Sequence, residues 1–344
     1  MFHKWLDNWD ESQALHGEAG KHLADFKLDA QLGFPGTRDI DSIDEFCAIA
    51  DQAVRNPRFF DQTDQGEPGF TYDEGWLRFP SSIDTDIEVN NTVTAKVTEG
   101  RSLDRVLVVF HHWNASSRQR QLAWFLSRCG VTVVEMALPF HLERSRPGAE
   151  HADYMLSPNL GRTIQSVRQG VLDARKLIGW LKREGYREIS VLGLSLGSMI
   201  AGLVAAHDPI VSKASLFLAA GDLADMVWTG RATRAIRHSL EPSIDLPGLR
   251  RAWSPLNLEN YAGRLARPTL DLQIVLAERD TVILPEISSS FVKSLKDVRA
   301  TPEVLKLNCG HYSLALPPYI LWAGWGLKRF LMARDQGKVA LETR

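Results

Sequence analysis

From Trp76 onward, short apolar runs alternate with longer segments in which apolar residues recur every three or four positions. The runs are rich in branched and aromatic residues, which is typical of strands buried on both faces of a parallel sheet. The pattern predicts strands at 105–112, 131–139, 187–195, 214–221, 270–278 and 303–308, and helices at 119–130, 163–185, 196–207, 285–295 and 318–332. The predicted fold is therefore α/β, with a mostly parallel central sheet and helices on both faces.

One segment interrupts the alternation. Residues 222–267 join two predicted strands through a long stretch with helical passages and a proline-spaced tail. A connection of this length in a compact α/β domain is usually a functional insertion. We interpret it as a helical cap over the functional site; a peripheral excursion that serves packing or a dimer contact is the alternative.

Charge divides the chain into unequal parts. Residues 1–75 contain 16 acidic and 6 basic side chains, whereas the remainder contains 26 acidic and 34 basic ones. We assign 1–75 to an acidic N-terminal arm with a weakly helical passage at 43–54, 76–335 to the core with its insertion, and 336–344 to a C-terminal tail. The arm is either a solvated acidic segment or a partial cover that folds over the more basic core, and we favour the cover.

Composition narrows the functional classes. The chain has 344 residues, of which 44% are hydrophobic and 24% charged, with a formal net charge of −2. These are ordinary globular values, and the length supports a sizeable core. A charge this close to zero provides no general attraction for phosphate backbones or anionic lipid, so nucleic acid is not an expected partner.

The cysteines and apolar segments bear on the compartment. Cys47, Cys129 and Cys309 are too few and too scattered for a disulfide framework or a zinc site. The first residues lack the apolar core of a signal peptide, and the apolar stretch 189–206 is short and interrupted by glycine. We expect a cytoplasmic protein without stable membrane insertion; the sequence is compatible with a homo-oligomer.

The most informative motif is Gly-x-Ser-x-Gly at 193–197, centred on Ser195. It stands where a predicted buried strand meets a predicted helix, which is the setting of a nucleophile elbow. A strand that turns at once into a helix strains its corner residue, and flanking glycines allow strand and helix to approach. The amide of Leu196, at the helix N-terminus, would face the oxygen of a reacting carbonyl group. Ser195 is therefore the candidate nucleophile.

A serine hydroxyl needs a base and a group that orients the base. Among the ten histidines, His311 follows the last predicted strand and sits beside a glycine, so we expect it to be the base. Asp280 lies just beyond the preceding strand and is the expected acid. Asp222, at another strand end, and Glu278 are the alternatives. The order Ser, Asp, His is the one expected for successive strand ends of an open sheet.

A second oxyanion donor is expected in the loop after the strand at 105–112. The loop begins with His111 and His112, and the amide of Trp113 or of Asn114 could face that of Leu196. Adjacent histidines on a strand point to opposite faces and no further ligand stands at a useful spacing, so we predict no metal site.

These residues together resemble the α/β-hydrolase superfamily over 76–332. The resemblance is carried by the elbow at 193–197, the acid loop at 278–280, the late Gly-His pair at 310–311 and the loop at 111–114, which stands where the family often has His-Gly. The elbow region and the double histidine are similar to the α/β-hydrolase domain-containing 18-like proteins. His112 replaces the frequent glycine, which implies an oxyanion loop of different shape.

The resemblance implies hydrolysis of a small-molecule carboxylic ester through an acyl-enzyme, without a cofactor. A thioesterase or amidase that uses the same three residues is one alternative, and a ligand-binding protein without catalysis is another. The substrate pocket is expected between the strand ends and the cap. Its wall could include four apolar residues of the cap, namely Met226, Trp228, Ile236 and Trp253, with His112 beside them. Core packing explains the four apolar residues equally well.

Overall fold

The computed structural model describes residues 2–18, 20–61 and 69–333. Within them lies one sheet with the strand order β1-β2-β3-β5-β4-β6-β7-β8-β9. The strands are β1 (Thr71–Asp73), β2 (Trp76–Pro80), β3 (Thr92–Thr98), β4 (Arg105–Phe110), β5 (Thr132–Met136), β6 (Glu188–Leu194), β7 (Val211–Phe217), β8 (Asp271–Ala277) and β9 (Glu303–Leu307). The strands from β4 to β9 pair in parallel, which confirms the predicted parallel sheet.

The central strand β4 shows why its sequence is apolar at every position. Val106, Val108 and Phe110 pack into a core on one face, and Leu107 and Val109 pack into a second core on the other. A strand has a period of two, so a strand covered on both faces needs apolar residues throughout.

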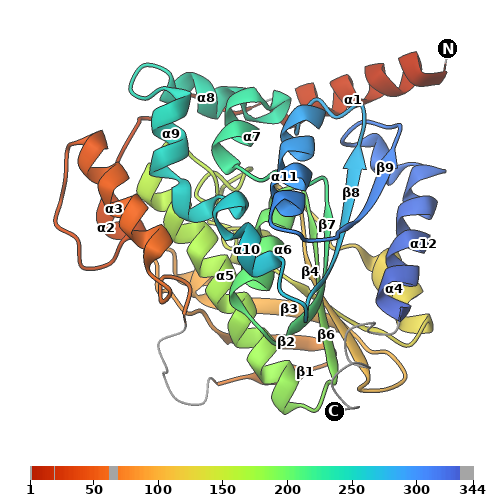
Figure 1. Cartoon of the computed structure of the whole chain (residues 1–344). Coiled ribbons are helices and arrows are strands. Elements are labelled where there is room, and N and C mark those ends of the chain that lie inside the picture. Colours follow the sequence, from red (N-terminus) through yellow and green to blue (C-terminus); the bar gives the residue numbers. More distant parts are fainter. Residues whose placement is uncertain (1, 19, 62–68, 334–344) are drawn as a thin grey trace.

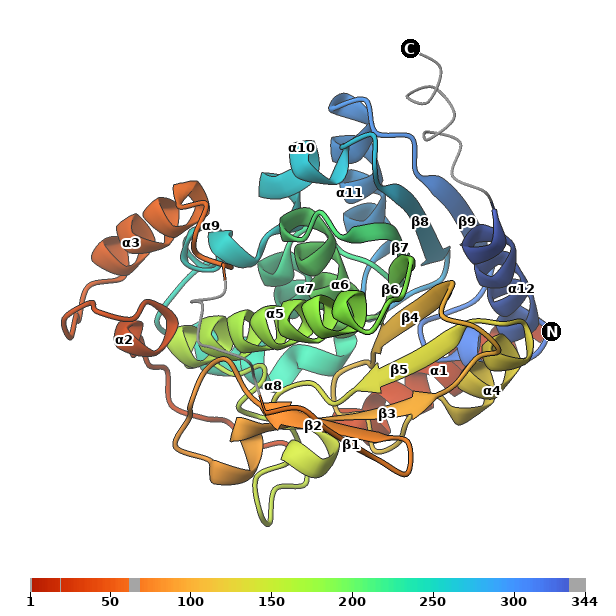
Figure 2. The same cartoon turned by 90° about the horizontal axis from the view of Figure 1, so that it is seen from below.

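Helices cover the two faces of the sheet as predicted. The first core contains residues of α5 (Leu160–Arg183), α6 (Leu196–His207) and α11 (Pro285–Asp297). The second contains residues of α4 (Arg120–Arg128) and α12 (Tyr319–Met332), which lie on the opposite side of the strands in both views (Figure 1, Figure 2).

The strands β1, β2 and β3 form an antiparallel edge that the sequence analysis did not predict. They mix polar with apolar residues, so they lack the continuous apolar runs of the parallel strands. Because β1 pairs with β2, the arm boundary drawn at residue 75 falls within a hairpin. The first strand of the sheet thus belongs to the segment assigned to the arm.

A buried polar network joins this edge to α5. The guanidinium of Arg144 lies 3.0 Å from the carboxylate of Asp173, and both side chains are fully buried. Ser81 Oγ donates to Asp173 at 2.9 Å, and Arg144 Nε donates to the carbonyl of Asn90 at 2.9 Å. Buried charges are tolerated when they are paired and hydrogen-bonded in this way. The network fixes the segment after β5, which contributes to the site described below.

The segment predicted as a cap is helical. It contains α7 (Leu223–Thr229), η3 (Arg231–Thr233), α8 (Arg234–Leu240), α9 (Leu246–Ala252), η4 (Ser254–Leu256), η5 (Leu258–Tyr261) and α10 (Ala262–Leu265). In Figure 1, α7 and α8 lie at the end of the molecule toward which the β8 arrow points. These two helices of the segment therefore lie near the carboxyl ends of the strands, where ligands bind in open α/β sheets.

The N-terminal arm is folded onto the rest of the molecule. It contains α1 (Phe2–Glu18), α2 (Ala30–Gly33) and α3 (Ile43–Arg55), of which α3 was predicted. The phenyl rings of Phe34 and Phe46 are buried in the first core. The predicted tail at 336–344 lies outside the described residues. Within the described ranges, no helix has both the length and the apolar character needed to cross a bilayer.

Candidate active site

Ser195 occupies the corner between β6 and α6, with φ +54° and ψ −119°. A side chain in this region is strained, so the surrounding structure must hold it there. The flanking glycines are required by space: a Cβ on Gly193 would lie 2.1 Å from the carbonyl oxygen of Gly197, and one on Gly197 would lie 2.3 Å from that of Phe110. This is the steric arrangement expected from the motif.

The structure brings His311 and Asp280 to this serine. His311 Nε2 lies 3.1 Å from Ser195 Oγ, and His311 Nδ1 lies 2.7 Å from Asp280 Oδ2. His311 follows β9 and Asp280 follows β8, so loops at the same end of the sheet supply all three side chains. The carboxylate keeps the proton on Nδ1, which leaves Nε2 as the acceptor for the serine hydroxyl.

Backbone amides in turn fix the carboxylate. Asp280 Oδ1 accepts hydrogen bonds from the amides of Val282 and Ile283, both at 2.8 Å. Only 4% of its surface is exposed, so the orientation of Asp280 is set by these bonds and by His311.

The two alternative acids are placed elsewhere. Asp222 caps α7 by accepting from the amide of Ala224 at 2.7 Å, and its other oxygen accepts from Asn257 at 2.6 Å. Burial, reinforced by the nearby charge of Asp225, raises the pKa of Asp222 to about 6. Glu278 is exposed. Asp280 is therefore the carboxylate that contacts His311.

Two buried histidines shape the loop after β4. His141 Nδ1 lies 2.8 Å from the carbonyl oxygen of Pro139, and its Nε2 accepts the amide proton of Asn114 at 3.0 Å. His111 makes the same pair of contacts, with the carbonyl of His112 at 2.8 Å and the amide of Leu138 at 3.1 Å. Each ring thus donates through Nδ1 and accepts through Nε2, which requires the neutral form.

The pKa values agree with these contacts. Burial lowers the pKa of His141 to about 4, and burial together with the neighbouring His141 lowers that of His111 well below its usual value. Both rings therefore stay neutral at physiological pH. The sequence pointed to His111 through its adjacent partner, whereas His141 carried no signal that distinguished it from other histidines.

The structure separates the two candidate oxyanion amides. The amide of Asn114 donates to His141, and its side-chain oxygen accepts from the amide of Ala152 at 2.8 Å. Asn114 has φ +57°, so the chain turns sharply at this residue. The amide of Asn114 is thus engaged in holding the loop, and Trp113 is the remaining candidate.

His112 lies at the site itself. Its Nδ1 is 2.7 Å from the carbonyl oxygen of Trp113. Packing around the ring, together with the nearby His311, lowers the pKa of His112. The residue as a whole is exposed to solvent.

The predicted apolar pocket residues belong to the core. Met226, Ile236 and Trp253 are buried in the first hydrophobic cluster, and Trp228 packs against it. This placement matches the packing alternative.

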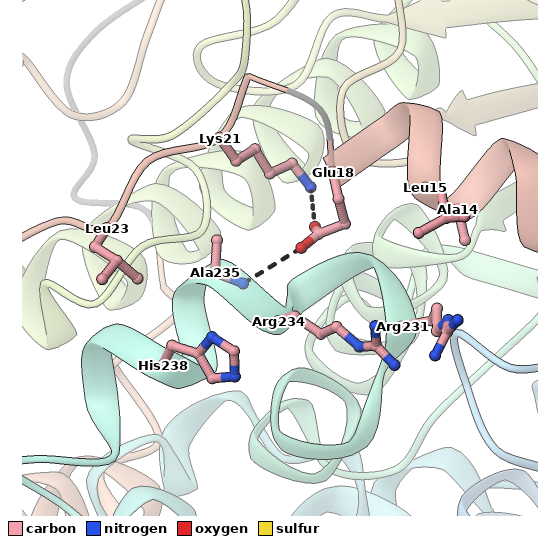
Figure 3. Close-up of a pocket in the computed structure, with 9 residues that line it drawn as sticks. All are labelled: Ala14, Leu15, Glu18, Lys21, Leu23, Arg231, Arg234, Ala235 and His238. Carbon is pink, nitrogen blue, oxygen red and sulfur yellow. Dashed lines mark hydrogen bonds and ion pairs between the residues drawn. The ribbon is translucent and has the colours of Figure 1, made fainter.

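A cavity of about 340 Å³ lies between α1 and α8, and its lining includes Lys21, Arg234 and His238. Figure 3 shows Glu18 at its edge, where the carboxylate bonds Lys21 at 2.7 Å and the backbone amide of Ala235 at 3.3 Å. The cavity is therefore a boundary between the arm and the cap. Ser195 and His311 do not line it.

The arm contacts several loops of the site, which the sequence analysis did not foresee in detail. Asp7 forms an ion pair with Arg279, the neighbour of Asp280. The ammonium of Lys21 lies 4.2 Å from the centre of the Trp113 ring and donates to the carbonyl of Ala232 in the cap at 2.8 Å. These contacts link distant parts of the sequence. Among the sequence features, only the opposite charge of the arm and the core indicated that the two would be in contact.

No protein-family model and no curated protein matches the sequence. Among solved structures, acetyl xylan esterase 1 from Thermoanaerobacterium sp. JW/SL YS485 is 16% identical with a TM-score of 0.60, over 90% of this chain and 100% of the esterase. The α/β hydrolase GrgF from Penicillium sp. sh18 is 14% identical with a TM-score of 0.54, over 74% of this chain and 96% of GrgF.

A puromycin-hydrolyzing peptidase from Mycobacterium tuberculosis is 15% identical with a TM-score of 0.53. The match covers 70% of this chain but 37% of the peptidase, so the chain spans well under half of that protein. The finer resemblance to the α/β-hydrolase domain-containing 18-like proteins stays a prediction. At these identities the likeness concerns the fold, and it shows that this chain has the α/β-hydrolase fold.

Proposed function

We propose that the protein is a serine hydrolase that cleaves a carboxylic ester through an acyl-enzyme. The observation that carries this proposal is the continuous chain of hydrogen bonds from Asp280 through His311 to Ser195. Three side chains from different loops meet in the order and at the distances that nucleophile activation requires. A strained serine at a strand-to-helix corner adds support, since such strain is found at functional sites.

The three side chains have distinct roles in the proposed reaction. Ser195 Oγ attacks the ester carbonyl carbon while His311 Nε2 takes the hydroxyl proton. The same proton passes to the departing alkoxide as the C–O bond breaks. Water then attacks the acyl carbon, gives a proton to His311 and releases the carboxylic acid, and that proton returns to Ser195. Asp280 stabilises the imidazolium and keeps its orientation; no cofactor takes part.

The oxyanion would be held by two backbone amides. The amide of Leu196 is in the first turn of α6, where N–H groups have no partner within the helix. The amide of Trp113 is the proposed second donor, because Asn114 bonds His141. Loss of one such donor typically costs about 2.7–4 kcal/mol of transition-state stabilisation.

An ester is the proposed substrate class for two reasons. Serine on this fold performs acyl transfer, and acetyl xylan esterases are among the structurally similar proteins. The second reason is an analogy at the level of the fold, so thioesters and amides are the alternatives that the experiment must separate.

A fluorophosphonate probe and a series of p-nitrophenyl esters of increasing acyl length test the proposal. We expect labelling and hydrolysis by the native protein, loss of both in Ser195→Ala, and retention of both in Ser289→Ala, which changes an exposed serine on α11. If the probe labels Ser195 but every ester is inert while thioesters or amides are cleaved, the ester assignment is wrong. A native protein that is neither labelled nor active would instead favour a binding function.

A further inference from the structure

The helix α1 lies outside the alternating strands and helices of the core, yet it contacts the loop of His311. In Figure 1 it crosses the same end of the molecule as α7 and α8. Along one face of α1, Leu6, Asp10 and Ala14 follow one another at a spacing of four residues, and all three are buried. Leu6 packs into the second core, which also contains Cys309.

Asp10 is the unusual member of this face. A carboxylate between two apolar positions is costly to bury unless it accepts hydrogen bonds. Its Oδ1 accepts from the amides of Tyr312 at 2.7 Å and Ser313 at 3.0 Å. These are the first two residues after His311. A charged acceptor makes such bonds stronger than neutral ones.

The residue before His311 is fitted to the same carboxylate. A Cβ on Gly310 would lie 2.4 Å from Asp10 Oδ2, so only glycine leaves room for the helix. The amide of Gly310 donates to Ser313 Oγ at 2.8 Å. Asp10 Oδ2 itself is buried and accepts no hydrogen bond from the described residues. Asp10 therefore contacts the His311 loop on both sides of the imidazole.

We infer that Asp10 is a positioning residue, which holds the His311 loop so that Nε2 faces Ser195 and Nδ1 faces Asp280. The inference rests on the proposed function, because it assigns His311 as the base. The imidazole must keep two hydrogen bonds in line while it gains and loses a proton. Its own loop is short and has Gly310 directly before His311, which adds freedom rather than order. The two bonds from Asp10 supply the missing constraint, and they come from the opposite end of the chain.

The test compares variants of Asp10 with a control on the same helix. Asp10→Ala removes the acceptor, Asp10→Glu displaces it by one methylene, and Asp10→Asn keeps an oxygen that can accept from both amides. Glu11→Ala serves as the control, because Glu11 pairs with Arg231 of the cap and does not touch the His311 loop. All are assayed with the best p-nitrophenyl ester, with thermal unfolding measured alongside.

We expect Asp10→Ala and Asp10→Glu to lower kcat at least tenfold with KM within threefold, and Asp10→Asn to retain at least a third of the native kcat. A folded Asp10→Ala protein with native kcat would overturn the inference. Equal losses in Asp10→Ala and Glu11→Ala would also overturn it, since docking of α1 as a whole would then explain both.

If Asp10→Ala does not fold, the ratio of kcat between Asp10→Asn and Asp10→Glu decides, and a ratio near one would overturn the inference. Failure of the proposed function looks different, because the native protein would then show neither labelling nor turnover. A native enzyme that depends on Ser195 but is indifferent to Asp10 contradicts the positioning role alone.

Discussion

Two kinds of histidine lie at the same end of the sheet, and they differ in the groups that their two ring nitrogens contact. His111 and His141 each pair one ring nitrogen with a carbonyl oxygen and the other with a backbone amide. His311 pairs with a carboxylate and a hydroxyl. The first arrangement fixes a neutral ring in one tautomer, whereas the second accommodates a proton arriving on Nε2.

The difference bears on which ring can take up a proton without losing a partner. A protonated His141 would have to give up the bond with the Asn114 amide, because an imidazolium donates through both nitrogens. A protonated His311 keeps both partners, since the carboxylate and the serine oxygen can each accept. We therefore propose that His311 transfers protons and that His141 fixes the shape of the loop after β4.

Removal of the reactive ring is expected to have the largest effect. His311→Gln removes the base, and kcat/KM should fall by about 10⁴–10⁶ because loss of one triad member removes most of the activation. Only 9% of the His311 side chain is exposed, but glutamine keeps an amide that can donate to Asp280, so we expect the free energy of unfolding to change far less than the activity. Ester turnover and urea unfolding measure the two quantities. A loss of activity below tenfold would mean that His311 is not the base.

Removal of the His141 ring should lower the stability more, and the activity less, than removal of the His311 ring. In His141→Leu the amide of Asn114 and the carbonyl of Pro139 lose their partners within the protein. Each buried polar group left unpaired costs about 1–3 kcal/mol, so for these two groups we expect the free energy of unfolding to fall by about 2–6 kcal/mol. Turnover should fall by about 10–100-fold through a displaced loop. Urea unfolding and kcat on the same preparation test this. An unchanged stability would contradict the structural role.

The sequence predicted the reactive ring better than the structural one, for a physical reason. Ser195, Asp280 and His311 each follow a strand of the parallel sheet, and the ends of parallel strands meet at one edge, so local patterns were enough to bring them together. His141 follows β5 through a turn whose shape depends on buried contacts such as the pair of Arg144 and Asp173. No periodicity encodes a turn of this kind.

The same limit applies to other parts of the molecule. The choice between Trp113 and Asn114 depended on the hydrogen bond from the amide of Asn114 to His141, which a residue pattern does not reveal. Asp10 contacts Tyr312 across almost the whole chain, and only its place between Leu6 and Ala14 marked it as a carboxylate on a buried face. The strands β1 to β3 were missed because polar residues interrupt them.

The smallest expected effect concerns pH and the neutral state of His141. Its pKa is lowered from 6.5 to about 4 in the folded protein, so the unfolded chain binds the proton more readily between these values. The resulting stability is present above pH 6.5 and is lost as pH falls toward 4. As the pH falls from 7 to 5.5, protonation of this one group in the unfolded chain should lower the free energy of unfolding by about 1 kcal/mol.

The measurement is the difference in unfolding free energy between the native protein and His141→Leu at each pH. Groups that His141 does not influence, including Asp222 with the opposite sign, cancel in that difference, whereas His111 adds to the effect in the same direction because His141 contributes to the lowering of its pKa. The native protein should lose more stability than the variant on acidification, so the gap between the two curves should narrow. Parallel curves would show that folding does not lower the pKa of His141. The distinction between the two kinds of histidine would then rest on His311 alone.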